Sequence, residues 1–102
     1  MNSNNNANIT NLTHKYLQLF VKQFPGSNIE LRIPQIAAIQ FGSGSSHRRG
    51  LPPNVVEMDQ LTFLALIEKT TDWQTQINCG KIDASGINSN LEKYFAKIDL
   101  NN

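Results

Sequence analysis

Hydrophobic residues first recur at helical spacing between residues 11 and 24. Successive apolar residues lie one, three or four positions apart, at Leu12, Tyr16, Leu19, Phe20 and Phe24. The polar residues Lys15, Gln18 and Lys22 fall between them. This pattern is typical of an amphipathic helix with one buried face. Pro25-Gly26 then ends the helix, because proline lacks the backbone N–H that a helix interior uses.

Strands are predicted next. Residues 28–33 read NIELRI, in which apolar and charged residues alternate with the period of a half-buried strand. Residues 36–42 are apolar enough for a second strand, and residues 54–58 for a short third one. Pro34 argues for a strand end or an edge position. A tight hairpin at Pro34-Gln35 and a bulge within one long strand both remain open.

Three helices are predicted in the second half of the chain. Asp59 suits the N-cap of a helix over residues 61–67, which is apolar on nearly every side and should be the most buried helix. Thr71-x-x-Gln74 has the form of a capping box, which starts a short helix at Asp72. Trp73 and Ile77 lie one turn apart on this helix, and Gly80 should be its C-terminal stop.

The C-terminal part reads as a weak strand and a last helix. Residues 81–86 read KIDASG, with Ile82 and Ala84 on one face. Ser89-x-x-Glu92 is a second capping box, and the helix after it places Leu91, Phe95 and Ile98 on one face. The predicted strands are grouped ahead of most of the helices, which favours an α+β layered domain over a parallel α/β repeat.

The length of 102 residues allows one domain, expected over residues 11–99. Residues 1–10 are polar and of low complexity, so we expect a disordered tail, and residues 100–102 should fray. The tail has neither the basic start nor the apolar stretch of a signal peptide, which predicts a cytoplasmic protein. Cys79 should then be a reduced thiol, and we expect it to be a small buried residue.

Charge and composition exclude several classes of protein. The formal net charge is +1, which is too small for a segment that coats nucleic acid. No apolar run approaches the roughly 18 residues of a membrane span, so we expect no stable membrane insertion. One cysteine cannot form an intramolecular disulfide, and with two histidines it makes no convincing zinc site. No cofactor is predicted.

Two stretches carry a family resemblance. Residues 47–59 read HRRGLPPNVVEMD, and residues 72–86 begin with Asp-Trp and end in GKIDASG. With the strand pair before them, they resemble the small actinobacterial sterol carrier family, a bacterial branch of the sterol carrier protein type two superfamily. The H-x-R-G-x-P-P-N-V-V-E-x-D pattern is specific, although Arg48 and Leu51 stand where threonine is usual. The resemblance covers residues 28–95.

The resemblance implies a small, curved, mostly antiparallel sheet with helices packed on one face. In the wider superfamily, a cavity between the sheet and the helices holds sterols, fatty acyl chains or other apolar ligands. We count about four strands where fuller members have five or more, and a lost strand could remove a wall of such a cavity. An empty cavity large enough for such a ligand would also lower the stability of the fold, by roughly 20–25 cal/mol for each Å3 of cavity volume.

The basic cluster His47-Arg48-Arg49 is the first candidate site. It could hold a phosphate or carboxylate, or Arg49 could pair with Glu57 or Glu30 and brace the loop. If Glu57 faces inward it must be paired, with Arg49 or Arg32 as the partner. The other residues of the run read as structural, because they preset the backbone before the third strand: Gly50, Pro52, Pro53 and Asn54, the last able to bond its own turn.

A catalytic site is the weaker reading of the same residues. His47 has the reference pKa of a general base, but the sequence implies no arrangement with a nucleophile such as Ser45, Ser46 or Cys79. Cys79 would lie at a helix C-terminus, where the helix dipole opposes thiolate formation. His14 reads as a surface or boundary residue.

The leading hypothesis is a non-enzymatic binding module for a small apolar or amphipathic ligand. Any acidic group of the ligand would lie near Arg49, and the apolar part would contact Phe63, Leu66, Trp73 and Ile77, which could equally be plain core. The alternative is a protein–protein interaction or accessory domain that pairs through a sheet edge, for example as a homodimer. An enzyme, such as a thiol-linked transferase, is a third hypothesis that rests on fold analogy alone.

Overall fold

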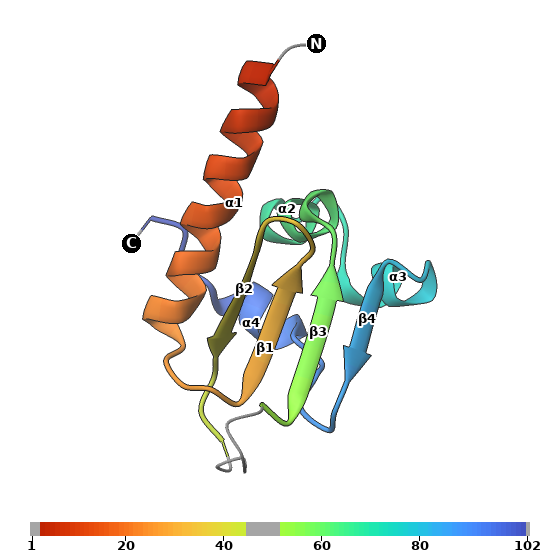
Figure 1. Ribbon diagram of the computed structural model, residues 1–102. Helices are drawn as coiled ribbons and strands as arrows, with labels where there is room; N and C mark the ends of the chain where they lie inside the picture. Colours follow the sequence, from red (N-terminus) through yellow and green to blue (C-terminus); the bar gives the residue numbers. More distant parts are fainter. Residues whose placement is uncertain (1–2, 45–51, 102) are drawn as a thin grey trace.

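The computed structural model describes residues 3–44 and 52–101. Their elements follow the order that the sequence predicts, with one helix before three strands, two helices, a strand and a helix. In chain order they are α1 (Ser3–Gln23), β1 (Ile29–Ile33), β2 (Ala37–Phe41), β3 (Asn54–Met58), α2 (Gln60–Glu68), α3 (Trp73–Asn78), β4 (Ile82–Ser85) and α4 (Glu92–Lys97). Figure 1 shows this arrangement.

The four strands form one open sheet in the order β2-β1-β3-β4. The β1–β2 and β3–β4 pairs are antiparallel, and β1 and β3 are parallel neighbours. The turn between β1 and β2 is the tight hairpin, because Ile36 N–H donates to the Ile33 carbonyl and Gln35 has a φ of 68°. The sheet is therefore mixed but mostly antiparallel, as the resemblance implies.

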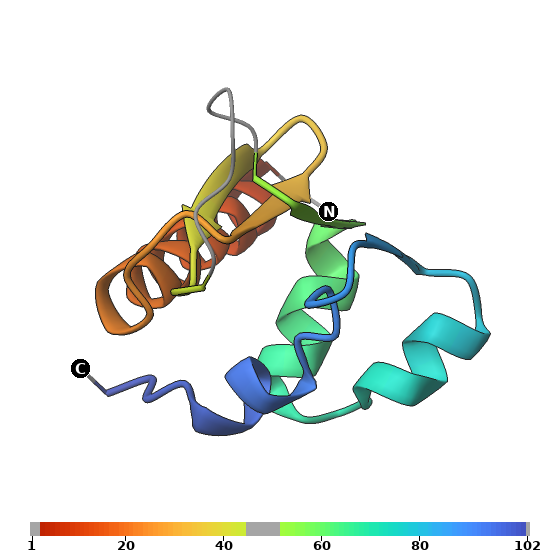
Figure 2. The same ribbon diagram turned by 90° about the horizontal axis from the view of Figure 1, so that it is seen from below.

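The helices pack on one side of the sheet (Figure 2). α1 lies against the sheet, α2 runs away from it after β3, α4 lies beside the far end of α2, and α3 lies beyond the β4 edge. Alternation along β1 explains which face is covered: Ile29, Leu31 and Ile33 are buried toward the helices. Glu30 and Arg32 lie on the other face of the sheet, which the described residues leave open.

A cluster of aromatic rings fills the space between the sheet and the helices. The Phe20 ring of α1 lies at its centre, with its centroid 5.3 Å from those of Phe41 and Phe95 and 5.9 Å from that of Phe63. These four side chains are at most 5% exposed. Ring pairs at such edge-on distances are favourable packing, so the described interior is a filled core.

Helix α2 confirms the prediction of a buried helix that begins after Asp59. The Asp59 carboxylate accepts a hydrogen bond from Thr62 N–H at 2.8 Å, which caps the first turn. Five of its nine residues are buried, on more than one side. Leu61 is the exception, with 67% of its surface exposed.

Other local predictions were wrong. α1 begins at Ser3 rather than near residue 11, so residues 3–10 are helical where a disordered tail was expected.

The predicted capping boxes do not form. The cap of α3 is Asp72, and Thr71 instead accepts a hydrogen bond from the Gln76 side chain. Ser89 caps no helix, because its hydroxyl donates to the Gly86 carbonyl. Cys79 is exposed, because it lies at the C-cap of a helix on the rim of the fold.

Candidate functional site

An apolar cleft of about 250 Å3 opens between the C-terminal end of α2, the start of α3, and α4. It brings together Leu66 and Trp73, two of the residues that the sequence nominated for ligand contact. Its lining consists of Leu66, Lys69, Thr71, Asp72, Trp73, Glu92, Phe95 and Ala96. We treat this cleft, called the α2–α4 cleft below, as the candidate binding site.

The floor of the α2–α4 cleft is made by three side chains that the core holds in place. Leu66, Trp73 and Phe95 are only 4–5% exposed. The Trp73 and Phe95 rings lie 6.3 Å apart with a tilt of 35°. A floor of this kind is rigid, because each side chain packs against the filled interior on its other side.

Two polar interactions position the walls of the cleft. Helix α2 ends at Lys69, which has a left-handed φ of 63°, and its Nζ donates to the Phe95 carbonyl of α4 at 3.0 Å. Asp72 caps α3 by accepting a hydrogen bond from Thr75 N–H at 2.8 Å, and Trp73 is the first residue of that helix. The Thr75 N–H also lowers the pKa of Asp72, so this carboxylate is ionised at neutral pH.

The remaining nominated apolar residues lie outside the cleft. Phe63 is fully buried and its ring lies 5.9 Å from that of Phe95, so it supports the floor from behind. Ile77 is half-buried and packs against the core one turn after Trp73. Arg49, the nominated partner of an acidic group, lies outside the described residues.

The part of the 47–59 run that the structure describes has a structural role. Asn54 is 1% exposed, and its Nδ2 donates to the backbone carbonyl and the side-chain oxygen of Asn28, at 3.0 and 3.2 Å. Its Oδ1 accepts from Asn88 N–H at 2.8 Å. Asn54 therefore joins the start of β1 to the β4–α4 loop, whereas the sequence predicted a bond within its own turn. Pro52 is half-buried and Pro53 exposed, while His47 and Gly50 lie outside the described residues.

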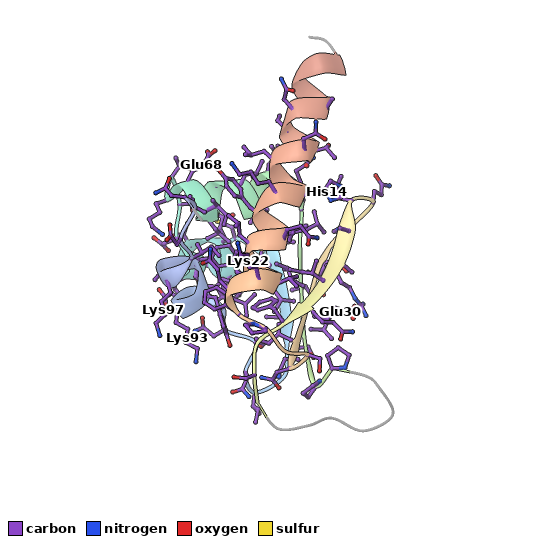
Figure 3. All side chains as sticks on the ribbon, turned by 90° about the vertical axis from the view of Figure 1, so that its left-hand side faces the viewer. His14, Lys22, Glu30, Glu68, Lys93 and Lys97 are labelled. Atoms are coloured by element: carbon purple, nitrogen blue, oxygen red, sulfur yellow. The ribbon has the colours of Figure 1, made fainter. Side chains whose placement is uncertain are left out.

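Glu57 lies on the open face of the sheet and is exposed, so it is not the inward-facing carboxylate that would require a buried partner. Its neighbour across the β1–β3 pair is Arg32. Arg32 forms an ion pair with Glu30, and this hydrogen bond, with a smaller contribution from Glu57, raises the pKa of Arg32. Figure 3 shows Glu30 on the sheet side of the molecule and Lys93 and Lys97 of α4 on the helix side.

Among the described residues, the candidates for a catalytic site lie apart from one another. Glu57 lies on the open sheet face, and Cys79 ends α3. His47, Ser45 and Ser46 lie outside the described residues. His14 is an exposed residue of α1, as predicted (Figure 3). Within residues 3–44 and 52–101, no cluster of three or more metal-ligating side chains occurs.

Two further clefts lie elsewhere on the surface. One, of about 400 Å3, has a more polar lining, made by Asn28, Ser43, Ile87, Asn88, Asn90, Glu92, Lys93 and Tyr94. The other, of about 460 Å3, is a shallow depression beside the β1–β2 turn, between Arg32 and Ala38. Neither contains a nominated apolar residue. Among the described helices, none combines the length and the apolar character needed to cross a bilayer.

The sequence did not nominate four residues of the α2–α4 cleft that give it shape and charge: Lys69, Asp72, Glu92 and Phe95. Asp72, Glu92 and Phe95 did have local signals, as the predicted start of a helix, as part of a capping box and as a core position. Their meeting with Leu66 depends on how α4 packs beside the far end of α2, which no short sequence pattern predicts.

Comparisons with known proteins give a family match for the chain. The model of a family described as bacterial SCP ortholog matches residues 5–96. No curated protein matches the chain. Among solved structures, sterol carrier protein 2 from Yarrowia lipolytica, in its apo form, is similar at 15% sequence identity and a TM-score of 0.46, with coverage of 90% of this chain and 81% of that one.

Proposed function

The chain belongs to the family of bacterial sterol carrier protein orthologs, and from this membership we propose that it is a non-enzymatic binding module for a small apolar or amphipathic ligand. The observation that carries the proposal is the α2–α4 cleft, with an apolar floor and charged side chains around its mouth. Ligand sites commonly combine such an apolar surface with a few polar groups that orient the ligand.

The packing of the described interior supports a ligand site at the surface of the helices rather than between the sheet and the helices. The Phe20, Phe41, Phe63 and Phe95 rings already occupy the described interior. The α2–α4 cleft, at about 250 Å3, is slightly smaller than the roughly 300 Å3 at which drug-sized pockets begin. It therefore suits a short alkyl chain or one end of a longer ligand, in contact with Leu66, Trp73 and Phe95.

Trp73 provides a direct test, because it is the only tryptophan of the chain and lies on the cleft floor. We expect its fluorescence and its indole N–H resonance to change on titration with straight-chain alcohols. Affinity should rise by about fourfold per added methylene while the cleft is being filled, and then level off. The length at which it levels off measures the usable depth of the cleft.

Two matched variants distinguish the cleft from nonspecific binding. Ala96 and Ala7 are both exposed helical alanines, but only Ala96 lines the cleft. Ala96→Phe should fill the mouth of the cleft and weaken alcohol binding, whereas Ala7→Phe on α1 should leave it unchanged. Equal binding by both variants, or no response of Trp73 to any alcohol, would refute binding in this cleft.

A further inference from the structure

The mouth of the α2–α4 cleft carries two carboxylates and one ammonium group, from Asp72, Glu92 and Lys69. The ammonium of Lys69 already donates to the Phe95 carbonyl. Neither carboxylate forms an ion pair within the described parts of the chain. The two lysines of α4, Lys93 and Lys97, do not line the cleft. Two carboxylates against one ammonium leave a net negative charge at the mouth of the cleft, although Lys69 keeps its positive charge while it donates to the carbonyl.

The cleft floor favours the same sign of ligand charge. Trp73 and Phe95 supply two aromatic rings at the bottom of the cleft. Aromatic faces attract cations, with tryptophan the strongest, and a nearby carboxylate adds a Coulombic attraction. An anionic headgroup would instead meet Asp72, whose pKa is lowered so that it stays ionised.

We propose that the polar end of the ligand is positively charged, so that the α2–α4 cleft prefers a short alkylammonium compound to an alcohol or a carboxylate of the same length. This inference rests on the proposed function, because it assigns the headgroup charge of a ligand bound in the same cleft. The alkyl chain extends over Leu66, and the ammonium group lies at the edge of the aromatic floor, between Asp72 and Glu92.

Three six-carbon probes test the charge while keeping the apolar part constant: hexylammonium, hexan-1-ol and hexanoate. Each is titrated into the full chain at low salt, and binding is followed by the Trp73 indole resonance. We expect hexylammonium to bind about fivefold more tightly than hexan-1-ol and hexanoate to bind most weakly, a difference of the size that surface ion pairs provide. Added salt should reduce the preference, because it screens exposed charges.

Charge-neutral variants locate the preference. Asp72→Asn keeps a side chain that can cap α3, and Glu92→Gln keeps the size of its side chain. Each should reduce the preference for hexylammonium and leave hexan-1-ol binding unchanged. Asp83→Asn is the matched control, because Asp83 is an exposed carboxylate on β4 at a distance from the cleft. It should leave all three affinities unchanged.

The outcomes separate this inference from the proposed function. Equal binding of the three probes, or a preference that survives in both cleft variants, would overturn the cationic headgroup and keep an apolar site. Tighter binding of hexanoate would overturn it too, and would redirect attention to Arg49. If no probe moves the Trp73 resonance, the proposed cleft function fails and this inference fails with it.

Discussion

Asn54 shows how one buried polar side chain can organise a whole end of the sheet. Its amide group makes three hydrogen bonds, to two atoms of Asn28 and to the backbone of Asn88. Gly86 lies so close that a Cβ there would be 2.3 Å from the Asn54 oxygen. The tight packing explains why this position needs an amide of this size, and why the neighbouring loop needs glycine.

Replacing this amide should therefore be costly. Asn54→Ala leaves two oxygens of the buried Asn28 without this donor, and each such group costs about 1–3 kcal/mol. We expect the free energy of unfolding, measured by urea denaturation, to fall by about 2–4 kcal/mol. Asn11→Ala is the control, because Asn11 is an exposed residue of α1. A loss of under about 0.5 kcal/mol in Asn54→Ala would contradict this role.

Among the elements, α2 shows what local sequence can predict. Its start follows from Asp59, and its burial from an apolar run that has no polar face. The sequence does not decide between a tight hairpin and a bulge after β1, because the choice depends on whether Gln35 adopts a positive φ. The capping boxes predicted at Thr71 and Ser89 do not form, because Asp72 caps α3 in place of Thr71 and the Ser89 hydroxyl donates to a turn instead.

The cap of α2 also predicts a response to acid. The Thr62 N–H that Asp59 binds lowers the pKa of this carboxyl in the folded state. The resulting stabilisation is present above the unfolded pKa of about 3.9, and it is lost as the pH falls through the lower folded value. Asp59→Asn keeps a cap without the charge, so its stability should fall less than that of the unsubstituted chain between pH 5 and pH 2.

Urea denaturation across this pH range measures the difference. Asp59→Ala provides the reference for loss of the cap itself, which should lower stability by about 1 kcal/mol at pH 7. An equal acid-induced loss in Asp59→Asn and in the unsubstituted chain would show that the Asp59 charge does not contribute.

At the scale of the whole molecule, the sequence predicted the class of fold but only part of the candidate site. Alternation in β1 and the apolar run of α2 are local patterns, and they predicted two layers correctly. The α2–α4 cleft forms between residues as distant in sequence as Leu66 and Phe95. Their meeting follows from the packing of α4 beside the far end of α2 and from the Lys69 bond to the Phe95 carbonyl, which are properties of the folded chain.

A second long-range contact ties α1 to the C-terminal segment. The Gln23 side chain donates to the Asp99 carbonyl at 2.7 Å, and its oxygen accepts from Asp99 N–H at 2.9 Å. This pair of bonds is exposed, so its net contribution to stability should stay below about 1 kcal/mol. Its main effect should be local order, because it holds the chain directly after α4.

Gln23→Ala tests this local effect. We expect the Asp99 amide to exchange with solvent at least about tenfold faster, while the urea midpoint of the whole molecule changes little. Gln18→Ala, at an exposed position of the same helix, is the matched control and should leave the exchange of Asp99 unchanged. Unchanged protection in Gln23→Ala would mean that the packing of Ile98 and Leu100 against the core holds this segment without the side-chain bonds.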